Sequence, residues 1–380
     1  MKGMMTMRTI LKRAVAAMLA LALCAGLAGC YSEDKAWAAK AGDNTLPIGG
    51  YIYYLTSAYT DAAGKVGTEQ AVFGSQIEGK DAKAWVEDRA LSYLRSYYYV
   101  SQKFDELGLT LDEDDQASIN SMATSMWGYY KSAFEGLGVA ESSFKETYAV
   151  YNTKLAKLLP ALYGKGGELE VSEDDLKAYY LDNYTYYQYF SIPLTKAGED
   201  DTAVDMEEDE KKEVREMLDD TVELINDGRL DFDKAVEKHK TLSSEEPTVG
   251  EPMAMGNSSM STLFSDALFP LKNEEAAVID ATSRYYVVQK LDITQDFEAL
   301  LADEERMDSL LRAMKGDDFL AYTMEQGAGL DVTINAKAIA GVKTTAIADV
   351  MGKNGTSSAE EDTASSSTSS TSSEGSSSEG

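Results

Sequence analysis

Few residues of this chain could do acid–base or metal chemistry. The 380 residues include one histidine, so a histidine-based zinc site or a Ser-His-Asp triad would have to use His239. His239 lies in the charged run 236–240, which is typical of a helix surface, and we expect its imidazole to be exposed. The acidic stretch 199–210 lacks the Asp spacing and central glycine of a calcium loop and predicts a solvated loop. We therefore expect no metal site and no cofactor.

The cysteines indicate lipidation instead. Cys24 and Cys30 are the only two, and Leu27-Ala28-Gly29-Cys30 closes a segment with a basic start and an apolar middle at 14–23. This order resembles a secretory signal peptide that ends in a bacterial lipobox, whose cysteine is lipidated and becomes the first residue. The apolar run is shorter than the roughly 20 residues that a membrane-spanning helix needs. We expect residues 1–29 to be removed and Cys30 to anchor the chain to the extracytoplasmic face of a bacterial cell membrane.

The charge of the chain excludes one class of partner. The formal net charge is −30 at pH 7, with 65 acidic and 35 basic residues. Such a surface repels the phosphates of nucleic acids and anionic lipid head groups. We therefore expect no nucleic-acid binding, and contact with the membrane only through the lipid anchor.

The first part of the mature chain has a helical pattern. Apolar residues recur at helical spacing over 81–107, over 112–137 and from about 141 to 162, and Pro47 suits the first turn of an earlier helix. Gly108 and Gly138 are well placed to end two of these helices. We expect residues 45–165 to form an all-helical domain with one shared core. Residues 30–44 are small and polar, and they predict a tether.

The next part predicts an α+β module over residues 168–295. The glycine-rich run 164–167 marks a boundary, and Ser172, with Asp175 three residues on, predicts the start of a helix. The module is expected to contain strands at 186–194 and 285–291, with helices between them around 214–225, 232–236 and 260–268.

The last part returns to a helical period. In the segment 296–352, the pattern predicts a helix over 297–314, a further helical piece around 319–324 and a short alternating run at 332–334. Residues 353–380 are Ser, Thr, Glu and Gly with almost no apolar side chain. Such a composition cannot bury enough surface to fold, so we expect a disordered tail.

This order of segments resembles the PrsA/SurA-type foldases, which assist the folding of exported proteins. Residues 171–180 resemble the helix that leads into the first strand of a parvulin-type peptidyl-prolyl isomerase, and 227–235 resemble that family's "Gly, Asp-Phe, then Ala" segment. Residues 260–271 resemble the segment that supplies its proline pocket. The resemblance implies an α+β fold class: a SurA-N-like helical chaperone domain, a parvulin-like domain and a C-terminal helix that returns to the helical domain.

The active-site positions depart from the family's pattern. The family has a histidine in its first strand, where this chain has Ser191, and a second one in its last strand, where this chain has Tyr286. The acidic or cysteine position between them falls near Thr241, and the family's glycine-rich loop remains only around Gly250. Both histidines are thus replaced, so the resemblance implies an isomerase activity that is weak or lost.

Two interpretations of the predicted pocket stay open. The resemblance places Met260, Phe264 and Phe269 in a proline-binding pocket, whereas their spacing alone is equally that of core residues on a helix. An apolar pocket binds a proline ring equally well whether the amide is planar or twisted. By itself it therefore binds the peptide without accelerating prolyl isomerisation. Hydrogen bonds from Ser191, Thr241 or Tyr286 would have to stabilise the twisted amide more than the planar one.

These patterns predict a membrane-anchored folding factor that binds unfolded or nascent exported proteins. We expect binding through the helical domain and the C-terminal helix, with tyrosine groups at 97–99, 129–130 and 184–189 as promiscuous contact surfaces. One alternative is an active peptidyl-prolyl cis-trans isomerase of the same architecture. A solute-binding lipoprotein would need repeated strand-helix-strand units, which the sequence does not show, and a purely structural envelope role is a further alternative.

Overall fold

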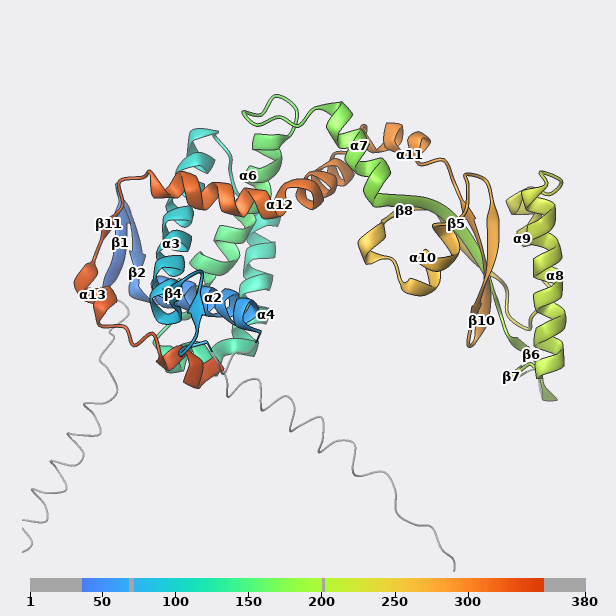
Figure 1. Cartoon of the computed structure of the whole chain (residues 1–380), viewed down its shortest axis with the longest axis horizontal. Helices are drawn as coiled ribbons and strands as arrows, with labels where there is room; N and C mark the ends of the chain where they lie inside the picture. Colours follow the sequence, from blue (N-terminus) through green and yellow to red (C-terminus); the bar gives the residue numbers. More distant parts are fainter. Residues whose placement is uncertain (1–35, 68–71, 200–201, 352–380) are drawn as a thin grey trace, which may run out of the picture. The chain divides into compact units, whose positions relative to one another are not determined.

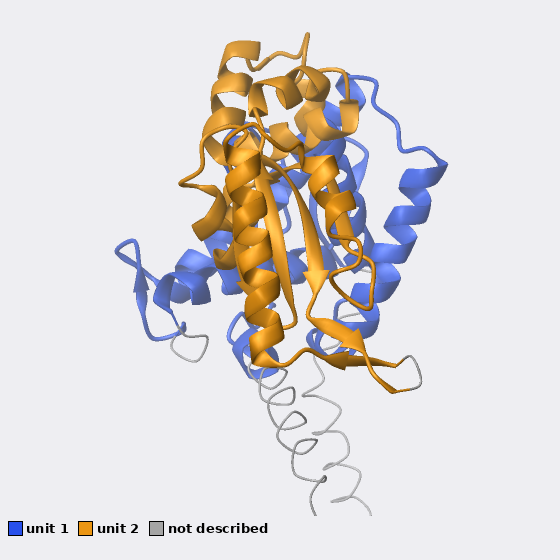
Figure 2. Ribbon diagram, turned by 90° about the vertical axis from the view of Figure 1, so that its right-hand side faces the viewer, with its two compact units in different colours: residues 1–158, 317–380 blue, residues 159–316 orange. Residues whose placement is uncertain are grey.

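The computed structural model describes residues 36–67, 72–199 and 202–351, which fold into two compact units (Figure 1). The helical unit comprises Met1–Leu158 with Asp317–Gly380, and the sheet unit comprises Leu159–Gly316 (Figure 2). The predicted signal peptide, Cys30 and the predicted tail at 353–380 lie outside the described residues. Within the described ranges, no helix is long and apolar enough to cross a membrane.

The unit boundaries fall inside two helices, α6 and α12, and not at the glycine run 164–167 or at residue 296. The glycine run is a turn within the sheet unit. It folds the chain back on the end of α6, where the Leu169 and Val171 amides donate to the carbonyls of Leu162 and Tyr163. A composition signal for a turn therefore lies near the boundary without marking it.

The predicted amphipathic helices are present in the helical unit. Asp81 caps α3 by accepting from the amides of Lys83 and Ala84, and Asp112 with Asp115 forms a capping box at the start of α4. The helices of this unit include α2 (Ile48–Val66), α3 (Ala82–Glu106), α4 (Glu113–Leu137), α5 (Glu141–Phe144), a π-helical turn (Lys145–Val150), the first part of α6 (Tyr151–Tyr163), the last part of α12 (Glu304–Ala328) and α13 (Ala336–Ala340).

The helical unit also contains strands. An antiparallel sheet has the order β11-β1-β2, and its strands are β1 (Trp37–Ala41), β2 (Asn44–Pro47) and β11 (Thr333–Ile334). A short hairpin, β3 (Gln76–Ile77) with β4 (Lys80–Asp81), precedes α3. Ala38 and Ala39 are fully buried. Residues 37–44 thus belong to the folded unit and not to a tether, because they pair with a strand from the far end of the chain that local composition does not reveal.

Helix α12 returns to the helical unit, as the resemblance implies. On α3, the Ser96 hydroxyl donates to Thr323 Oγ1 at 2.7 Å, and the Tyr99 hydroxyl donates to the Tyr322 hydroxyl at 3.2 Å. The predicted helix over 297–314 is wrong in its limits, because the chain breaks between α11 (Ile293–Leu300) and α12. Helix α12 is then continuous over Glu304–Ala328 and includes the predicted piece at 319–324. The predicted gap is polar but holds no proline that would stop a helix. The α+β fold class is confirmed.

The sheet unit is built on a four-stranded antiparallel sheet of order β8-β5-β10-β9. The sequence predicts β5 and β10 but neither β8 nor β9. Strand β8 contains two glycines and a proline, which disfavour strands, and pairing with the tyrosine-rich β5 overrides that preference. The elements of the unit include α7 (Glu173–Asn183), β5 (Tyr184–Pro193), β6 (Thr195–Ala197), β7 (Ala203–Asp205), α8 (Glu208–Asn226), α9 (Phe232–Lys238), β8 (Thr248–Gly256), α10 (Thr262–Leu268), β9 (Ala276–Ala281), β10 (Arg284–Lys290) and α11 (Ile293–Leu300).

Helices cover both faces of this sheet (Figure 1). On one face, Phe190 and Val287 pack into a buried core with Leu218 of α8 and Phe232 of α9. On the other, which we call the α10 face, a second and smaller core forms around α10; its buried members are Tyr187, Met260, Leu268, Ile279 and Val288. The sheet therefore has one tightly covered face and one that a single short helix covers.

The acidic stretch 199–210 is not the loop that the sequence predicts. Ala203–Asp205 forms β7, which pairs with β6, and Glu208 begins α8. The Lys196 ammonium donates to Glu210 at 2.6 Å, so part of the negative charge is paired within the unit. No group of three or more potential metal ligands occurs among the described residues.

Candidate functional site

Strand pairing brings two of the predicted site residues together on the α10 face. Ser191 of β5 lies directly opposite Tyr286 of β10, and Tyr189 lies opposite Val288. Residues opposite each other in an antiparallel pair project from the same face of the sheet. Ser191, Tyr286 and Tyr189 are therefore neighbours on the face that α10 covers.

An aromatic cluster occupies the centre of this face. The ring of Phe264, on α10, lies 5.2 Å from that of Tyr286, 6.1 Å from that of Tyr189 and 6.0 Å from that of Tyr187 between centroids. Tyr189 and Tyr286 are 5.8 Å apart. These spacings are in the range of favourable edge and tilted aromatic pairs. Met255 of β8 and Met260 pack against the same group.

The three predicted pocket residues do not share one environment. Met260 is buried in the core of the α10 face, and Phe264 is half-buried in the aromatic cluster. Phe269 is 48% exposed and lines a separate cavity of about 200 Å³ with Tyr186 and Lys290. Met260 thus has the burial of a core residue, Phe264 is partly accessible, and the proline-binding role of the three residues stays a prediction.

Thr241 lies apart from the other two predicted polar positions. It is exposed in the turn after α9, between His239 and Leu242, both of which pack on the α8/α9 side of the sheet. No hydrogen bond of the described residues joins it to Ser191 or Tyr286. A polar triad of Ser191, Thr241 and Tyr286 is therefore not assembled here.

Arg284 is the polar residue of this face that the sequence analysis missed. Its Nη1 donates to the hydroxyl of Ser191 at 3.2 Å, and Ser191 is fully buried. Alternation along β10 was the available signal, since Arg284 is two residues before Tyr286. A guanidinium stays protonated in proteins, so Arg284 can donate hydrogen bonds to a carbonyl but cannot serve as a general base.

Gly250 has a steric role beneath the cluster. A Cβ atom on Gly250 would lie 2.1 Å from the Tyr189 ring, so the ring packs directly onto the backbone of β8. The ladder between β5 and β8 shifts register between Tyr187 and Tyr189, next to this contact. Gly250 thus makes room for an aromatic ring.

His239 is buried, which corrects the expectation of an exposed helix histidine. Its Nε2 lies 2.7 Å from Thr221 Oγ1, and its ring is stacked on Phe190 at 6.4 Å. The Thr221 hydroxyl donates to the Met217 carbonyl, so a neutral His239 with its proton on Nε2 completes the pair. Burial first, and then Lys238, lower the pKa of His239 to about 4. His239 belongs to the core under α8 and α9, away from the α10 face.

Large apolar side chains are exposed along the segment that builds the α10 face. Between residues 249 and 269 these are Val249, Met253, Leu263 and Phe269. Met253 pairs with Tyr187 and so projects from the α10 face, and Leu263 lies on α10 itself. Contiguous exposed apolar surface on a folded domain marks an interaction site.

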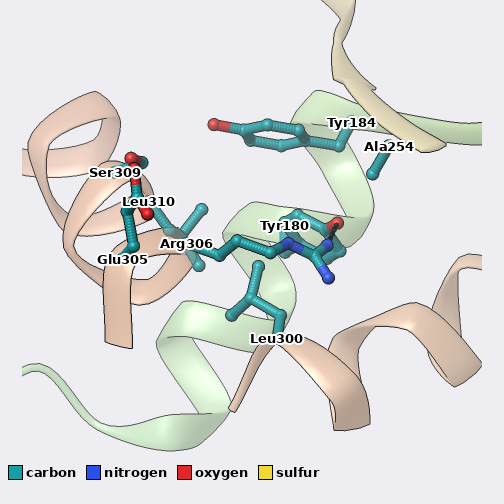
Figure 3. Close-up of a pocket in the computed structure, with 8 residues that line it drawn as sticks. All are labelled: Tyr180, Tyr184, Ala254, Leu300, Glu305, Arg306, Ser309 and Leu310. Carbon is teal, nitrogen blue, oxygen red and sulfur yellow. Dashed lines mark hydrogen bonds between the residues drawn. The ribbon is translucent and has the colours of Figure 1, made fainter. Parts of the chain in front are cut away.

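A second hollow in the sheet unit has a polar floor. It holds about 240 Å³ and is lined by residues of α7, β5, β8, α11 and α12. Figure 3 shows the Arg306 side chain extending toward Tyr180, with the ring of Tyr184 above it in this view. Arg306 donates to Asp296 at 2.5 Å and to the Tyr180 hydroxyl at 3.1 Å, and Tyr180 also donates to Asp296. Because these groups satisfy one another, we assign them the structural role of joining α7, α11 and α12.

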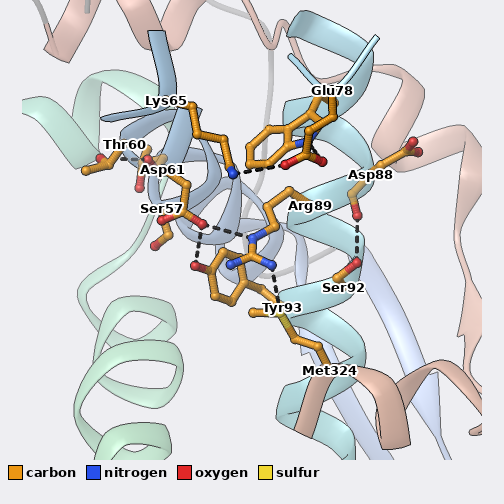
Figure 4. Close-up of polar contacts among 12 residues, drawn as sticks. Ser57, Thr60, Asp61, Lys65, Glu78, Asp88, Arg89, Ser92, Tyr93 and Met324 are labelled. Carbon is orange, nitrogen blue, oxygen red and sulfur yellow. Dashed lines mark hydrogen bonds and ion pairs between the residues drawn. The ribbon is translucent and has the colours of Figure 1, made fainter. Parts of the chain in front are cut away.

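The helical unit has its own polar cluster, drawn in Figure 4. Asp61 Oδ2 accepts from Arg89 Nε at 2.9 Å and from the Tyr93 hydroxyl at 2.7 Å, and Arg89 also contacts Met324 of α12. A wider hollow of about 680 Å³ lies near the β1–β2 turn and Tyr98. The polar cluster ties α12 to α2 and α3.

Of the two tyrosine groups predicted as surfaces of the helical unit, the group at 97–99 is largely buried and the group at 129–130 is at the surface. Tyr97 and Tyr98 are buried, whereas Tyr129 is exposed beside Tyr130 on α4. The buried hydroxyls make hydrogen bonds within the unit, such as that from Tyr97 to Glu146 at 2.9 Å. Helix periodicity could not separate buried from exposed members in a run of three tyrosines.

Comparisons with known proteins return foldase structures. No family model and no curated protein matches the chain. A crystal structure of the foldase protein PrsA from Lactococcus lactis is 15% identical with a TM-score of 0.35, and the match covers 84% of this chain and 98% of that one. PrsA from Streptococcus pneumoniae is 15% identical with a TM-score of 0.33, over 80% and 97% of the two chains. PrsA from Bacillus subtilis is 14% identical with a TM-score of 0.29, over 78% and 92%. The chain is thus similar, over most of its length, to solved structures of the class that its sequence resembles.

Proposed function

We propose that this protein is a membrane-anchored, extracytoplasmic folding factor that holds unfolded exported polypeptides. The α10 face carries the proposal: a central aromatic cluster of Tyr189, Phe264 and Tyr286, with Met253 and Leu263 exposed beside it. Tyrosine offers a large flat contact area with a hydrogen-bonding tip, and methionine adapts its shape to different partners. Such a surface suits transient, promiscuous binding of apolar segments.

The same surface favours binding over catalysis. Ser191, at a degenerate catalytic position, is buried and already accepts a hydrogen bond from Arg284. Thr241 is remote from it. The remaining polar groups of the face, Tyr286 and Arg284, can hydrogen-bond a peptide carbonyl but give little preference for a twisted amide. We therefore place isomerase activity at a weak or absent level and client holding at the centre of the function.

Anchoring follows from the sequence. Cys30, with the lipobox-like residues before it, would carry the lipid, and the folded units would then stand outside the cell membrane where exported chains emerge. The clients are unfolded or nascent exported proteins.

Suppression of aggregation tests the proposal. The full-length protein with Cys30→Ser, which removes the predicted lipid, is added to an unfolded client diluted from denaturant, and light scattering is followed. We expect Met253→Gln with Leu263→Gln to reduce protection about fivefold, because interface centres concentrate binding energy in few apolar residues. Met217→Gln with Leu301→Gln is the matched control. Met217 is 40% exposed against 41% for Met253, and Leu301 is 39% exposed against 44% for Leu263.

Three outcomes would overturn the proposal. They are an absence of protection by the parent protein, an equal loss in the control pair, and full protection by the Met253→Gln, Leu263→Gln pair. Prolyl cis/trans exchange in a short peptide is measured on the same samples. Strong acceleration that Phe264→Ala abolishes would replace the holding role by catalysis.

A further inference from the structure

The segment that builds the α10 face carries acidic residues and no basic ones. From residue 241 to residue 271 the chain has no lysine or arginine, and its carboxylates are Glu245, Glu246, Glu251 and Asp266. All four are exposed, and none forms an ion pair within the described part of the chain. Some other carboxylates of the sheet unit are paired; examples are Glu210 with Lys196, Glu237 with Lys240 and Glu275 with Lys272.

These four carboxylates lie on the chain segments that border the α10 face. The Ser244 amide donates to the Thr195 carbonyl at 3.1 Å, which holds Glu245 and Glu246 near the end of β5 that carries Ser191. Glu251 lies on β8 where the ladder shifts register beside Tyr189, and Asp266 lies on α10. The negative charge thus follows the β8 side of the face and the helix above it.

Two cations belong to the same face. Arg284 donates to Ser191 Oγ, and the Lys290 ammonium donates to the Leu271 carbonyl at 2.9 Å. Both are partly buried and hold neutral oxygens of the unit in place. Lys240, in the turn after α9, also interacts electrostatically with Glu246. These cations offset part of the negative charge, and the four carboxylates, which we call the rim carboxylates, still leave an acidic excess.

The geometry of β8 disfavours capture of a client as an added strand. Its outer edge pairs with no strand among the described residues, but Pro252 lies in it next to the register shift. Proline lacks an amide donor, and proline, charge and irregularity are the usual protections of an edge strand. A bound segment therefore lies across the face and is recognised by its side chains.

We infer that the α10 face selects polypeptide segments that combine apolar side chains with lysine or arginine. This inference rests on the proposed folding-factor function and specifies the class of its clients. The apolar side chains would bind on the aromatic cluster and Met253. The basic side chains would face the rim carboxylates, where opposite charge speeds association and discriminates against acidic segments. A lysine or arginine can also bind over the face of an exposed tyrosine ring.

Two fluorescent peptides test this inference. They have the same length and the same leucine and phenylalanine positions, and they differ only in carrying lysine or glutamate between them. By anisotropy at low salt, we expect the lysine peptide to bind the full-length Cys30→Ser protein about tenfold more tightly, as several exposed charge pairs together allow. Glu245→Gln, Glu246→Gln, Glu251→Gln and Asp266→Asn combined should remove most of that preference. Added salt should weaken only the lysine peptide.

A control with the same charge change separates a local effect from the acidity of the whole protein. Asp209→Asn, Glu213→Gln, Asp220→Asn and Glu223→Gln together remove four exposed carboxylates from α8, on the other side of the sheet. The preference should survive in this control, and an equal loss there would overturn the assigned site. Equal binding of both peptides by the parent protein overturns the inference and leaves the proposed function standing. Failure of both peptides to bind overturns the proposed function itself.

Discussion

Tyrosines are placed differently in the core of the helical unit and on the α10 face of the sheet unit. In the helical unit, tyrosines such as Tyr51, Tyr97 and Tyr98 are buried, and burial raises their pKa above the ordinary range. On the α10 face of the sheet unit, Tyr189 and Tyr286 are only half-buried, and their hydroxyls form no hydrogen bond within the described part of the chain. The same residue type is a core residue in the first region and partly exposed in the second.

The difference follows from how each element is covered. Helix α3 has α2 and α12 packed against it, so a tyrosine on its inner side must find hydrogen-bond partners inside. The α10 face has one helix of seven residues over four strands, which leaves ring edges and hydroxyls at the surface. Surface that is not covered in the fold is available to a client.

The largest expected effect tests the close packing of the helical unit. A Cβ on Gly327 of α12 would lie 2.7 Å from the Arg95 carbonyl carbon and oxygen, which are backbone atoms that cannot rotate away. We expect Gly327→Ala to destabilise the helical unit by about 2–3 kcal/mol, as overpacking does. Gly316→Ala on the same helix is the control, because nothing lies within 4 Å of its added Cβ. Chemical denaturation measures both, and equal stabilities would show that α12 packs less closely than described.

The second expected effect is a pH dependence of stability that is confined to the sheet unit. The pKa of His239 is lowered from 6.5 to about 4 in the folded state, so between these values the unfolded chain binds more protons. Above about pH 6.5 His239 does not lower the free energy of unfolding of the sheet unit. As the pH falls toward 4 this free energy decreases, by about 2 kcal/mol at pH 5.

The single histidine makes this test clean. His239→Gln should flatten the difference between pH 7 and pH 5, and the helical unit, which has no histidine, should show no change from this cause. Urea unfolding at the two pH values, with one probe in each unit, measures it. An unchanged slope in His239→Gln would mean that the imidazole titrates normally and is not buried as described.

The smallest effect separates two buried tyrosines of the helical unit. The Tyr98 hydroxyl accepts from the Leu46 amide at 3.1 Å and donates to the Ala39 carbonyl at 2.7 Å, which joins β1 and β2 to α3. The Tyr54 hydroxyl is buried without a hydrogen-bond partner among the described residues. We expect Tyr98→Phe to cost about 1–2 kcal/mol and Tyr54→Phe to be neutral or stabilising. Thermal unfolding compares them, and an equal cost would indicate that an internal water serves Tyr54.

Local signals predicted the helices well. The caps at Asp81, Asp112 and Ser172 and the periodicity of α3 and α4 are properties of neighbouring residues, and the structure has helices within one residue of those limits. The strands β5 and β10 were likewise visible as runs of aromatic and β-branched residues.

Long-range pairing was the part that local signals missed. Strand β8, the pairing of β1 with β11, and the burial of His239 against Phe190 each depend on a partner far away in the chain. Strand β9 was also missed, although its partner β10 follows it directly. The arrangement of the candidate site also depends on long-range pairing. Ser191 and Tyr286 could be named from the resemblance, but their approach on one face, the contact with Arg284 and the separation of Thr241 depend on sheet register and on the position of a turn.

The sequence by itself determined the class of this protein: an acidic chain with a lipobox-like start, a helical part, an α+β part and a histidine count that leaves little acid–base chemistry. These properties follow from composition and from periodicity over a few turns. Only the tertiary structure decided which tyrosines are core and which are surface, and that the exposed Met253 and Leu263 lie beside the aromatic cluster of the α10 face. Burial is a property of what packs on top of a residue, and that neighbour comes from elsewhere in the chain.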